Sequence, residues 1–314
     1  MQAVVEADVA GDPSGACKWI RQSLRSIKAR LASIGFLVSH TSIRRLLKQL
    51  GYSLKANRKS VATTQHPQRD QQFRYLERVK ERFIKAGHPV LSVDTKKKEL
   101  IGNFKNPGQE WTQQAEAVND HDFPKDALAK AVPYGIYDLV HNQGYVYVGT
   151  SGDTAAFAVD AIVRWFKRKD RPRFADESKI LILCDSGGSN GYRVRNWKLQ
   201  LQEKLADPHE ITVMVCHYPS GASKWNPIEH RLFSFISLNW AGKPLRSLAQ
   251  MTALIRGTTT QTGLRVKAAQ IKGVYPTRIK VSDQQMAALN LTHRPICPQW
   301  NYMIHPRSQS AQKP

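Results

Sequence analysis

Residues 180–185, with the sequence ILILCD, form a wholly apolar run that ends on an acid. A short run of this kind, followed by the glycine-rich segment 186–191 (SGGSNG), is typical of a strand that is buried on both faces of a sheet. Residues 89–94 (PVLSVD) form a second such run, and it ends on Asp94. Because acids at the carboxyl ends of neighbouring strands meet at one edge of an open sheet, we expect Asp94 and Asp185 to lie close together.

The segments around these runs predict a mixed sheet flanked by helices. Residues 134–140 (YGIYDLV) and 145–148 (YVYV) predict two strands joined by the hairpin sequence HNQG. Further elements follow in the order helix 154–169, helix 192–205, strand 211–216 and helix 225–239. The order of strands and helices predicts an α/β fold, and the last helix carries Glu229 in its first turns.

The N-terminal region predicts two helices. Residues 16–34 have apolar side chains at helical spacing, and Gly35 would end that helix. Ser39 or Thr41 would cap a second helix, which Gly51 would end. Residues 62–70 have the composition of a linker. We therefore expect a helix-turn-helix module over residues 1–62.

The charge of the chain favours a polyanionic partner. The 314 residues include 47 Lys and Arg against 25 Asp and Glu, a net charge of +22, and 41% are hydrophobic. Residues 1–60 hold eleven Lys and Arg against three acids, a net charge of +8. The phosphate backbone of a nucleic acid is such a partner whatever the base sequence. Basic ribosomal and membrane-surface proteins carry a similar charge. We expect the N-terminal module to bind DNA.

No segment predicts secretion or membrane insertion. The N-terminus lacks a basic segment followed by an apolar run, and no stretch approaches 18 uninterrupted apolar residues. The four cysteines are scattered, which argues against a zinc knuckle or a disulfide framework and favours reduced, mostly buried thiols. We expect a cytoplasmic protein that associates with the bacterial nucleoid and makes no membrane contact.

Three acids are candidates for one metal site. Asp94, Asp185 and Glu229 would converge at the sheet edge, and clustered carboxylates repel each other unless cations hold them. Hard oxygen ligands select Mg²⁺ or Mn²⁺, and two such ions about 4 Å apart support phosphoryl displacement. Asp122, Asp138 and Asp153 compete for this role. Asp138 lies inside a strand pattern and Asp153 just before a helix, where capping explains it.

Four motifs together resemble bacterial insertion-sequence transposases of the Rhodopirellula type. They are residues 92–99 (SVDTKKKE), 133–138 (PYGIYD), 185–190 (DSGGSN) and 223–231 (SKWNPIEHR). The NPIE element within the last motif also resembles that of mariner-like transposases. The resemblance implies a ribonuclease-H-like core and a DDE triad of Asp94, Asp185 and Glu229 that holds two divalent metal ions.

The resemblance also implies a domain organisation. We expect a linker helix over 63–88, a catalytic domain over 89–240 and a helical C-terminal extension over 241–314. Members of the family usually carry more chain ahead of the segment at which this sequence begins, which predicts a truncated copy.

Basic and aromatic residues are candidates for DNA contact. In the N-terminal module, the exposed face of the second helix and the basic segment after it would contact DNA. In the core, side chains near the three acids would do so by charge or stacking, although solvation or packing explains each of them equally. The candidates are Ser42, Arg44, Arg45, Lys48, Lys55, Arg58, Lys59, Lys96, Lys98, Arg193, Arg195, Lys224 and Trp225.

The sequence thus predicts a DNA transposase that cuts and joins strands at the ends of an insertion sequence. Its partners would be the terminal repeats and target DNA, both double-stranded, and bringing two ends together implies a homo-oligomer. Two alternatives remain open at this stage. One is a ribonuclease-H-like nuclease without joining activity, and the other is a non-catalytic DNA-binding remnant of a mobile element.

Overall fold

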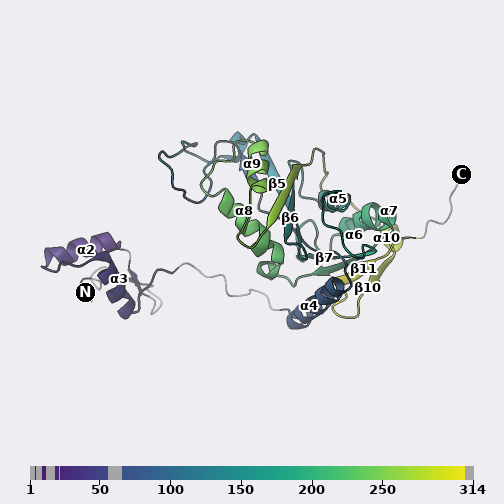
Figure 1. The fold of residues 1–314 in the computed structure, drawn as a ribbon, viewed down its shortest axis with the longest axis horizontal. Helices are drawn as coiled ribbons and strands as arrows, with labels where there is room; N and C mark the ends of the chain where they lie inside the picture. The colour runs from purple at the N-terminus through teal and green to yellow at the C-terminus, as the bar shows by residue number, and fades with distance from the viewer. Residues whose placement is uncertain (1–3, 5–8, 12–17, 21, 56–65, 308–314) are drawn as a thin grey trace. The chain divides into compact units, whose positions relative to one another are not determined.

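The structure is a computed structural model that describes residues 4, 9–11, 18–20, 22–55 and 66–307 (Figure 1). The chain divides into two compact units, residues 1–61 and 62–314. Arg58, Lys59 and Cys17 lie outside the described residues.

The first unit contains a pair of short strands and a pair of helices. The elements are β1 (Val9–Gly11), β2 (Lys18–Ile20), α2 (Leu24–Ser33) and α3 (His40–Gln49). The two helices bury Ile27, Leu31 and Ile43 against each other. Ser39 caps α3 as expected, because its side chain accepts a hydrogen bond from the backbone N–H of Ser42.

The first helix begins later than its periodicity predicts. Residues 18–20 form β2, which pairs in antiparallel fashion with β1, so the predicted start at residue 16 is wrong. Ser23 sets the actual start because its side chain accepts a hydrogen bond from the N–H of Ser26, which caps α2. Gly35 and Gly51 end the two helices with φ of +89° and +83°, where a glycine is favoured.

A nine-stranded mixed sheet forms the second unit. Its order is β10-β11-β8-β7-β3-β5-β6-β9, with β4 paired to β5. The strands are β3 (Val90–Thr95), β4 (Glu99–Ile101), β5 (Ala129–Asp138), β6 (Gln143–Gly149), β7 (Lys179–Cys184), β8 (Thr212–His217), β9 (Arg265–Gln270), β10 (Leu291–His293) and β11 (Asn301–Ile304). The central pairs β3·β7 and β7·β8 are parallel, whereas β3·β5 and β5·β6 are antiparallel.

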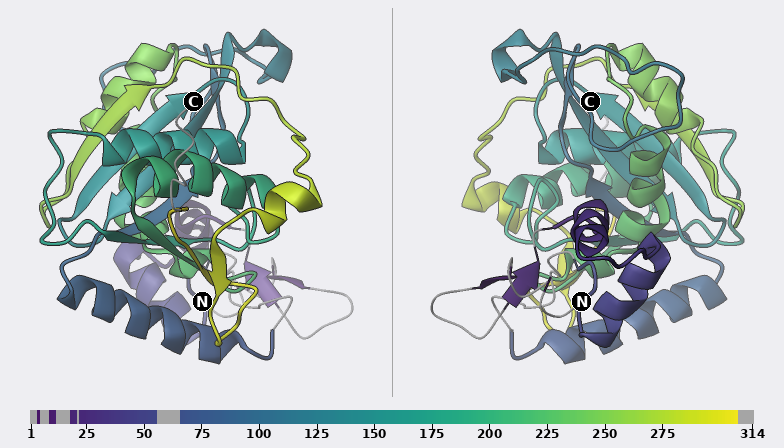
Figure 2. Two further views of the ribbon diagram at one scale, coloured as in Figure 1. Left: turned by 90° about the vertical axis from the view of Figure 1, so that its right-hand side faces the viewer. Right: turned by 90° about the vertical axis from the view of Figure 1, so that its left-hand side faces the viewer.

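Helices cover both faces of the sheet (Figure 1). They are α4 (Arg69–Lys85), α5 (Ala155–Phe166), α6 (Arg195–Leu201), α7 (Asp207–His209), α8 (Ser234–Asn239), α9 (Leu248–Arg256) and α10 (Asp283–Ala287), with short 3₁₀ turns at Pro124–Asp126 and Ser223–Trp225 and π turns at Gln202–Ala206 and Glu229–Phe233. On one face α5 and α6 lie side by side (Figure 2). On the other face, α4 packs on β7 and β8 while α8 and α9 pack on β5 and β6.

The burial pattern explains this layering. Along β7, Ile180, Ile182 and Cys184 face α5 and α6, whereas Leu181 and Leu183 face α4. Because successive side chains of a strand point to opposite faces, an unbroken apolar run is what a doubly covered strand requires. The predicted α/β fold with a mixed sheet and flanking helices is therefore confirmed.

The region after residue 240 differs from the expected helical extension. It contains α9 and α10, but it also supplies β9, which forms one edge of the sheet, and β10 and β11, which lie at the opposite edge. β9 pairs in parallel with β6, and β11 pairs in antiparallel fashion with β8. These strands are short or half-exposed, so their sequences lack the apolar run that marks a central strand.

The predicted linker helix likewise belongs to the second unit. α4 buries Tyr75, Leu76, Val79 and Phe83 against the central strands. Cys184, Cys216 and Cys297 are buried free thiols, as expected. Among the helices of the described residues, none combines the length and apolar character needed to cross a bilayer.

Candidate active site

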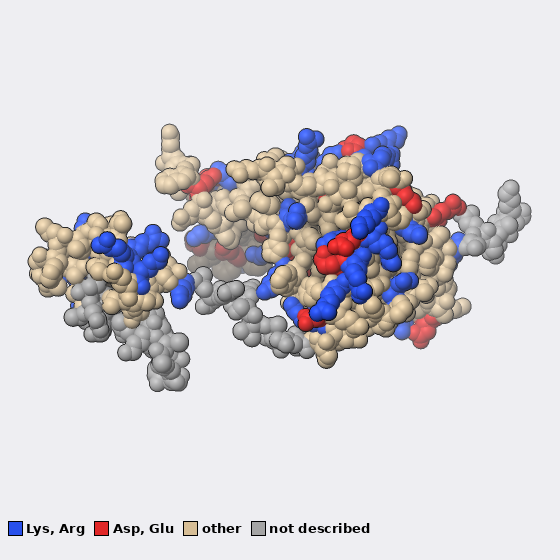
Figure 3. All heavy atoms as spheres, turned by 60° about the horizontal axis from the view of Figure 1, so that its bottom comes forward, with Lys and Arg blue, Asp and Glu red and all other residues tan. Residues whose placement is uncertain are grey.

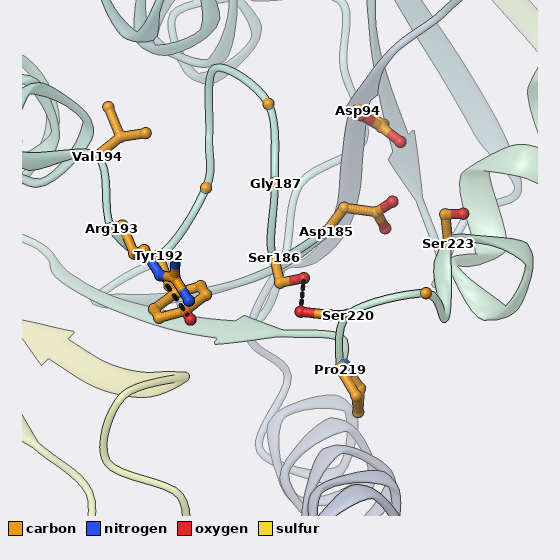
Figure 4. Close-up of a pocket in the computed structure, with 13 residues that line it drawn as sticks. Asp94, Asp185, Ser186, Gly187, Tyr192, Arg193, Val194, Pro219, Ser220 and Ser223 are labelled. Carbon is orange, nitrogen blue, oxygen red and sulfur yellow. Dashed lines mark hydrogen bonds between the residues drawn. The ribbon is translucent and has the colours of Figure 1, made fainter. Parts of the chain in front are cut away.

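Asp94 and Asp185 meet at one edge of the central sheet, as the sequence predicts. β3 and β7 run in parallel with Val93 opposite Cys184, so the next residue of each strand is one of the two acids. Both side chains are half-buried, and both line a cleft of about 670 Å³ (Figure 4). The rest of its wall comes from the glycine-rich loop, from residues 192–194 after it, and from Pro219, Ser220, Gly221 and Ser223.

A buried amide connects these strands to the segment that precedes Glu229. The Asn226 side chain is fully buried, and its Nδ2 donates to Asp185 Oδ1 at 3.0 Å. Its Oδ1 accepts from Ser92 Oγ at 2.5 Å, and that hydroxyl accepts from the N–H of Ile228 at 3.0 Å. Asn226 therefore holds Asp185, strand β3 and the start of the Glu229 helix in one hydrogen-bonded network. Asn226 and Ser92 belong to two of the four motifs, but nothing in the local sequence predicts that they contact each other.

Glu229 begins a π turn that packs tightly on the sheet. Gly135 lies directly opposite Asp94 in the β3·β5 pair. A Cβ atom at Gly135 would overlap the ring of Phe233 and lie 2.9 Å from Ile228 Cδ1. The absence of a side chain at this position lets the Glu229 segment approach the strand beside Asp94. A π turn within a helix is often found at a functional position.

Burial raises the proton affinity of all three acids, and neighbouring carboxylates add to the effect at Asp94 and Asp185. Burial and the neighbouring charge of Asp185 raise the pKa of Asp94 to about 8, with Glu229 and Asp153 adding to the effect. Burial and Glu229 raise the pKa of Asp185 to about 6, against the hydrogen bond from Asn226. Burial also raises the pKa of Glu229, while Lys96 and His230 oppose the rise. Like charges held in a partly desolvated cleft favour a cation between them.

The donor chemistry of this site suits a hard divalent cation. The available donors are carboxylate oxygens, which Mg²⁺ and Mn²⁺ prefer. His217 is buried behind Asp185, where its ring contacts the Asp185 carbonyl and the Tyr302 hydroxyl, so it does not reach the cleft. Over the described parts of the chain, no three acidic, His or Cys side chains come close enough to enclose an ion. Asp94 and Asp185 share the cleft, whereas Glu229 is not part of its wall.

The competing acids have other environments. Asp138 is fully buried, and its carboxylate accepts from the N–H groups of Val140 and His141 and contacts the His141 ring. Asp122 is exposed and accepts from the N–H of Lys105 at 3.3 Å. Both therefore have structural explanations.

Asp153 is the acid whose predicted role is wrong. Thr154, not Asp153, caps α5. Asp153 instead accepts from Thr95 Oγ1 at 2.9 Å and lies 3.8 Å from Lys98 Nζ. It therefore lies beside Asp94 rather than at the end of a helix.

The candidate DNA contacts of the first unit lie on α3 and after it. Arg44, Arg45 and Lys48 are exposed on α3, and Ser42 is half-exposed near its start. Lys55 is exposed beyond the helix.

In the second unit, Lys96 differs from the expectation of a DNA contact. Its side chain is buried, with Nζ 3.5 Å from Glu99 Oε1 and 4.6 Å from the centre of the Trp240 ring. Burial lowers the pKa of Lys96. Lys98, two residues later, is exposed. The three consecutive lysines therefore have unlike environments, which no local pattern could reveal.

Of the remaining candidates, Arg193 lines the cleft that Asp94 and Asp185 share, whereas Arg195, Lys224 and Trp225 are not part of its wall. Arg193 is exposed over the Tyr192 ring, while the Arg195 guanidinium is 2.6 Å from an Asp283 carboxylate oxygen. Trp225 is 55% exposed beside Phe73, and Lys224 Nζ lies 5.5 Å from the centre of the Trp225 ring. The Trp225 side chain is thus not buried in the core, and Arg195 already has an anionic partner.

A family model described as the Rhodopirellula transposase DDE domain matches residues 1–306. The chain belongs to this transposase family. The resemblance drawn from the four motifs is thereby confirmed. No curated protein sequence matches the chain.

Solved structures similar to this family member include three Mos1 transposase complexes. They are the paired-end complex with the left transposon end (15% identity, TM-score 0.45), the strand transfer complex (15%, 0.44) and the mariner paired-end complex with Mn (14%, 0.44). Each match covers 77% of this chain and 72% of the other.

Proposed function

We propose that the chain is a DNA transposase that cuts strands at the ends of an insertion sequence and joins the freed ends to target DNA. One observation carries the proposal: two aspartates from neighbouring parallel strands share a cleft, and Asn226 ties them to the segment that carries Glu229. Membership of a DDE transposase family supports the assignment of all three acids as catalytic.

Asp94, Asp185 and Glu229 would hold two Mg²⁺ or Mn²⁺ ions. Bound there, the ions would supply an activated oxygen nucleophile and charge stabilisation for the leaving oxygen. The contribution of the chain is to keep the two aspartates in register, which the β3·β7 pairing does, and to keep their charges partly desolvated.

The proposed reaction has two phosphoryl transfers. In the first, a water molecule loses a proton as its oxygen bonds to the scissile phosphorus, the bond from phosphorus to the 3′ oxygen breaks, and the 3′ oxygen takes up a proton. In the second, the freed 3′-hydroxyl loses its proton and bonds to a phosphorus of the target strand, whose own 3′ oxygen leaves and is protonated. No oxidant, reductant or nucleotide is required.

Double-stranded DNA would be the substrate in both steps. The net charge of +22 supports binding to phosphate backbones, and Ser42, Arg44, Arg45, Lys48 and Lys55 of the first unit would read the element ends. Arg58 and Lys59 remain candidates for the same surface. Holding two ends at once would require a homo-oligomer, and the reaction would take place on the nucleoid.

The test uses the full chain and duplexes carrying the DNA that flanks its coding sequence. With Mg²⁺ or Mn²⁺ we expect nicking at the element end and a joined product with a second duplex. Glu229→Gln should abolish both products while leaving duplex binding intact. Cleavage without joining would indicate a nuclease, and binding without cleavage a remnant; either result in the wild type would overturn the proposal.

A further inference from the structure

A second cleft opens beside Asp94. It has a volume of about 410 Å³ and, besides Asp94 and Thr95, is lined by four lysines, Asp153, Gly188 and Ser189. Asp94 and Gly188 belong to the walls of both clefts. The two clefts therefore meet at the first of the catalytic acids.

The charges of the two clefts are opposite. The wall of the first cleft has Asp94 and Asp185 with Arg193 as its one basic side chain. The second has Lys96, Lys97, Lys98 and Lys130 against Asp94 and Asp153. A cleft with an excess of lysines attracts an anion, whereas a cleft dominated by carboxylates attracts a cation.

Three of the four lysines are available to a ligand. Lys97 and Lys130 are exposed, and neither forms an ion pair with any described residue. The Lys98 side chain is 42% exposed, and its only anionic neighbour in the described chain is Asp153, at 3.8 Å. Lys96 is excluded because Glu99 and Trp240 surround its ammonium group.

Ser189 supplies an independent indication of a ligand. The residue is only 9% exposed, and its hydroxyl has no hydrogen-bond partner among the described residues. Buried hydroxyl groups are normally hydrogen-bonded, so an unpaired one in the wall of a cleft marks a position where a partner is missing. Serine hydroxyls and lysine ammonium groups are common donors to phosphate oxygens.

The exposed face of α4 shows that a high density of lysine and arginine alone does not make such a site. Arg74, Arg78, Arg82 and Lys85 are exposed there, but Glu77 and Glu81 are exposed among them. Figure 3 shows the resulting mixture of basic and acidic side chains on the face turned forward. The second cleft differs because it combines a hollow, unpaired lysines and an unsatisfied donor next to a catalytic acid.

We propose that Lys97, Lys98, Lys130 and Ser189, together called the lysine cleft, bind backbone phosphates of the DNA strand that is cut. With the scissile phosphate at Asp94 and Asp185, the same strand continues into the lysine cleft on one side of the cut. The lysines offset the repulsion between the strand and the catalytic carboxylates. The inference rests on the proposed function and identifies the path of its substrate.

The test compares two double variants of the full chain. Lys98→Ala/Lys130→Ala removes two lysines of the cleft. Lys85→Ala/Lys179→Ala is the matched control, because both residues are exposed and Lys179 begins β7, at the opposite end from Asp185. DNA affinity is measured against salt concentration without divalent metal, on the element-end duplex.

Three duplexes locate the contact: the intact one, and two in which the cut strand stops at the scissile phosphate on one side or the other. Loss of two phosphate contacts should lower the slope of log affinity against log salt by about 1.5 on the intact duplex. The loss should persist on one truncated duplex and vanish on the other. An unchanged slope, a loss equal to that of the control, or an equal loss on both truncated duplexes would overturn the inference.

Asp153→Asn should change DNA affinity in the opposite direction. Asn keeps an oxygen for the Thr95 hydroxyl but removes the charge that faces Lys98. We expect DNA affinity to rise a few-fold, whereas a folding defect would lower it. Plasmid nicking by the wild type is measured in parallel. If the wild type does not nick, the result counts against the proposed function. If the wild type nicks and the lysine variant binds DNA as the wild type does, this inference is overturned but the proposed function is not.

Discussion

The two ends of the β3·β5 pair hold acids in contrasting environments. At one end Asp138, opposite Leu91, is fully buried and accepts two backbone N–H groups while contacting the His141 ring. At the other end Asp94, opposite Gly135, accepts one backbone N–H and faces the charges of Asp185 and Glu229. The protein itself satisfies Asp138, so it stabilises the fold. The carboxylate of Asp94 has fewer hydrogen bonds from the protein, which leaves oxygen lone pairs for a bound cation.

The contrast predicts that the acids of the cleft, Asp94 and its neighbour Asp185, affect a different property from Asp138. Asp185→Asn keeps the shape of the side chain but removes its charge from the cleft. We expect strand cleavage to slow on the order of 10³-fold or more, because several kcal/mol of charge stabilisation would be lost. The measurement is a single-turnover cleavage rate with DNA affinity as control. A rate within tenfold of the wild type would contradict the assignment.

Asp138→Ala should affect stability instead. Its removal leaves the N–H groups of Val140 and His141 without their acceptor and leaves an empty space at a fully buried position. We expect the free energy of unfolding to fall by about 3 kcal/mol, measured by urea denaturation. Asp122→Ala, at an exposed position, is the control and should change it by less than about 0.5 kcal/mol. Equal effects of the two variants would show that burial of Asp138 has no structural role.

Asn226 lies between these two roles, since it is buried like Asp138 yet contacts Asp185. As a positioning residue, Asn226→Ala should reduce cleavage about 10- to 100-fold and raise the Mg²⁺ concentration needed for half-maximal rate. Asn301→Ala is the matched control, because Asn301 is an equally buried amide that bonds to Gln72. It should lower stability without changing the Mg²⁺ dependence. The same dependence in both variants would reduce Asn226 to a packing role.

The smallest expected effect is the pH dependence of the metal-free protein. Burial and the charge of Asp185 raise the pKa of Asp94 from its ordinary value of 3.8 to about 8 in the folded chain, so the folded state binds more protons between these pH values. Its stability should therefore fall as pH rises from about 4 to about 8, on the order of 1 kcal/mol after solvent screening.

Thermal unfolding in chelator at pH 5 and pH 8 measures this fall. Asp94→Asn should flatten the pH profile, and Mg²⁺ at pH 8 should restore stability to the wild type by binding the folded state. A wild-type profile that is equally flat would show that the carboxylates do not repel each other.

Local patterns revealed the centre of the fold but not its margins. The apolar runs that became β3 and β7 were recognisable because strands covered on both faces need continuous hydrophobicity. The runs also placed Asp94 and Asp185 at the same edge. β9 has three half-exposed or exposed polar residues and β10 has only three residues in all, so pairing with neighbouring strands, rather than their own pattern, makes them strands.

The active site shows the same division. Motif order identified Asp94, Asp185 and Glu229 as candidates because each follows or begins a recognisable element. Three adjacent lysines, however, have identical local chemistry, and only the positions of Trp240 and Glu99 bury Lys96 while leaving Lys98 exposed. The same holds for Asp153, whose neighbour Thr154 takes the capping role.

The sequence by itself determined the charge of the chain, its central strands, its candidate acids and its family resemblance, because these depend on composition and short-range periodicity. Only the tertiary structure decided which polar groups the fold satisfies internally. That selection depends on contacts between residues far apart in sequence, such as Ser92 with Asn226 and Lys96 with Trp240. It distinguishes the structural Asp138 from the candidate catalytic Asp94, and it separates the lysine cleft from the rest of a basic surface.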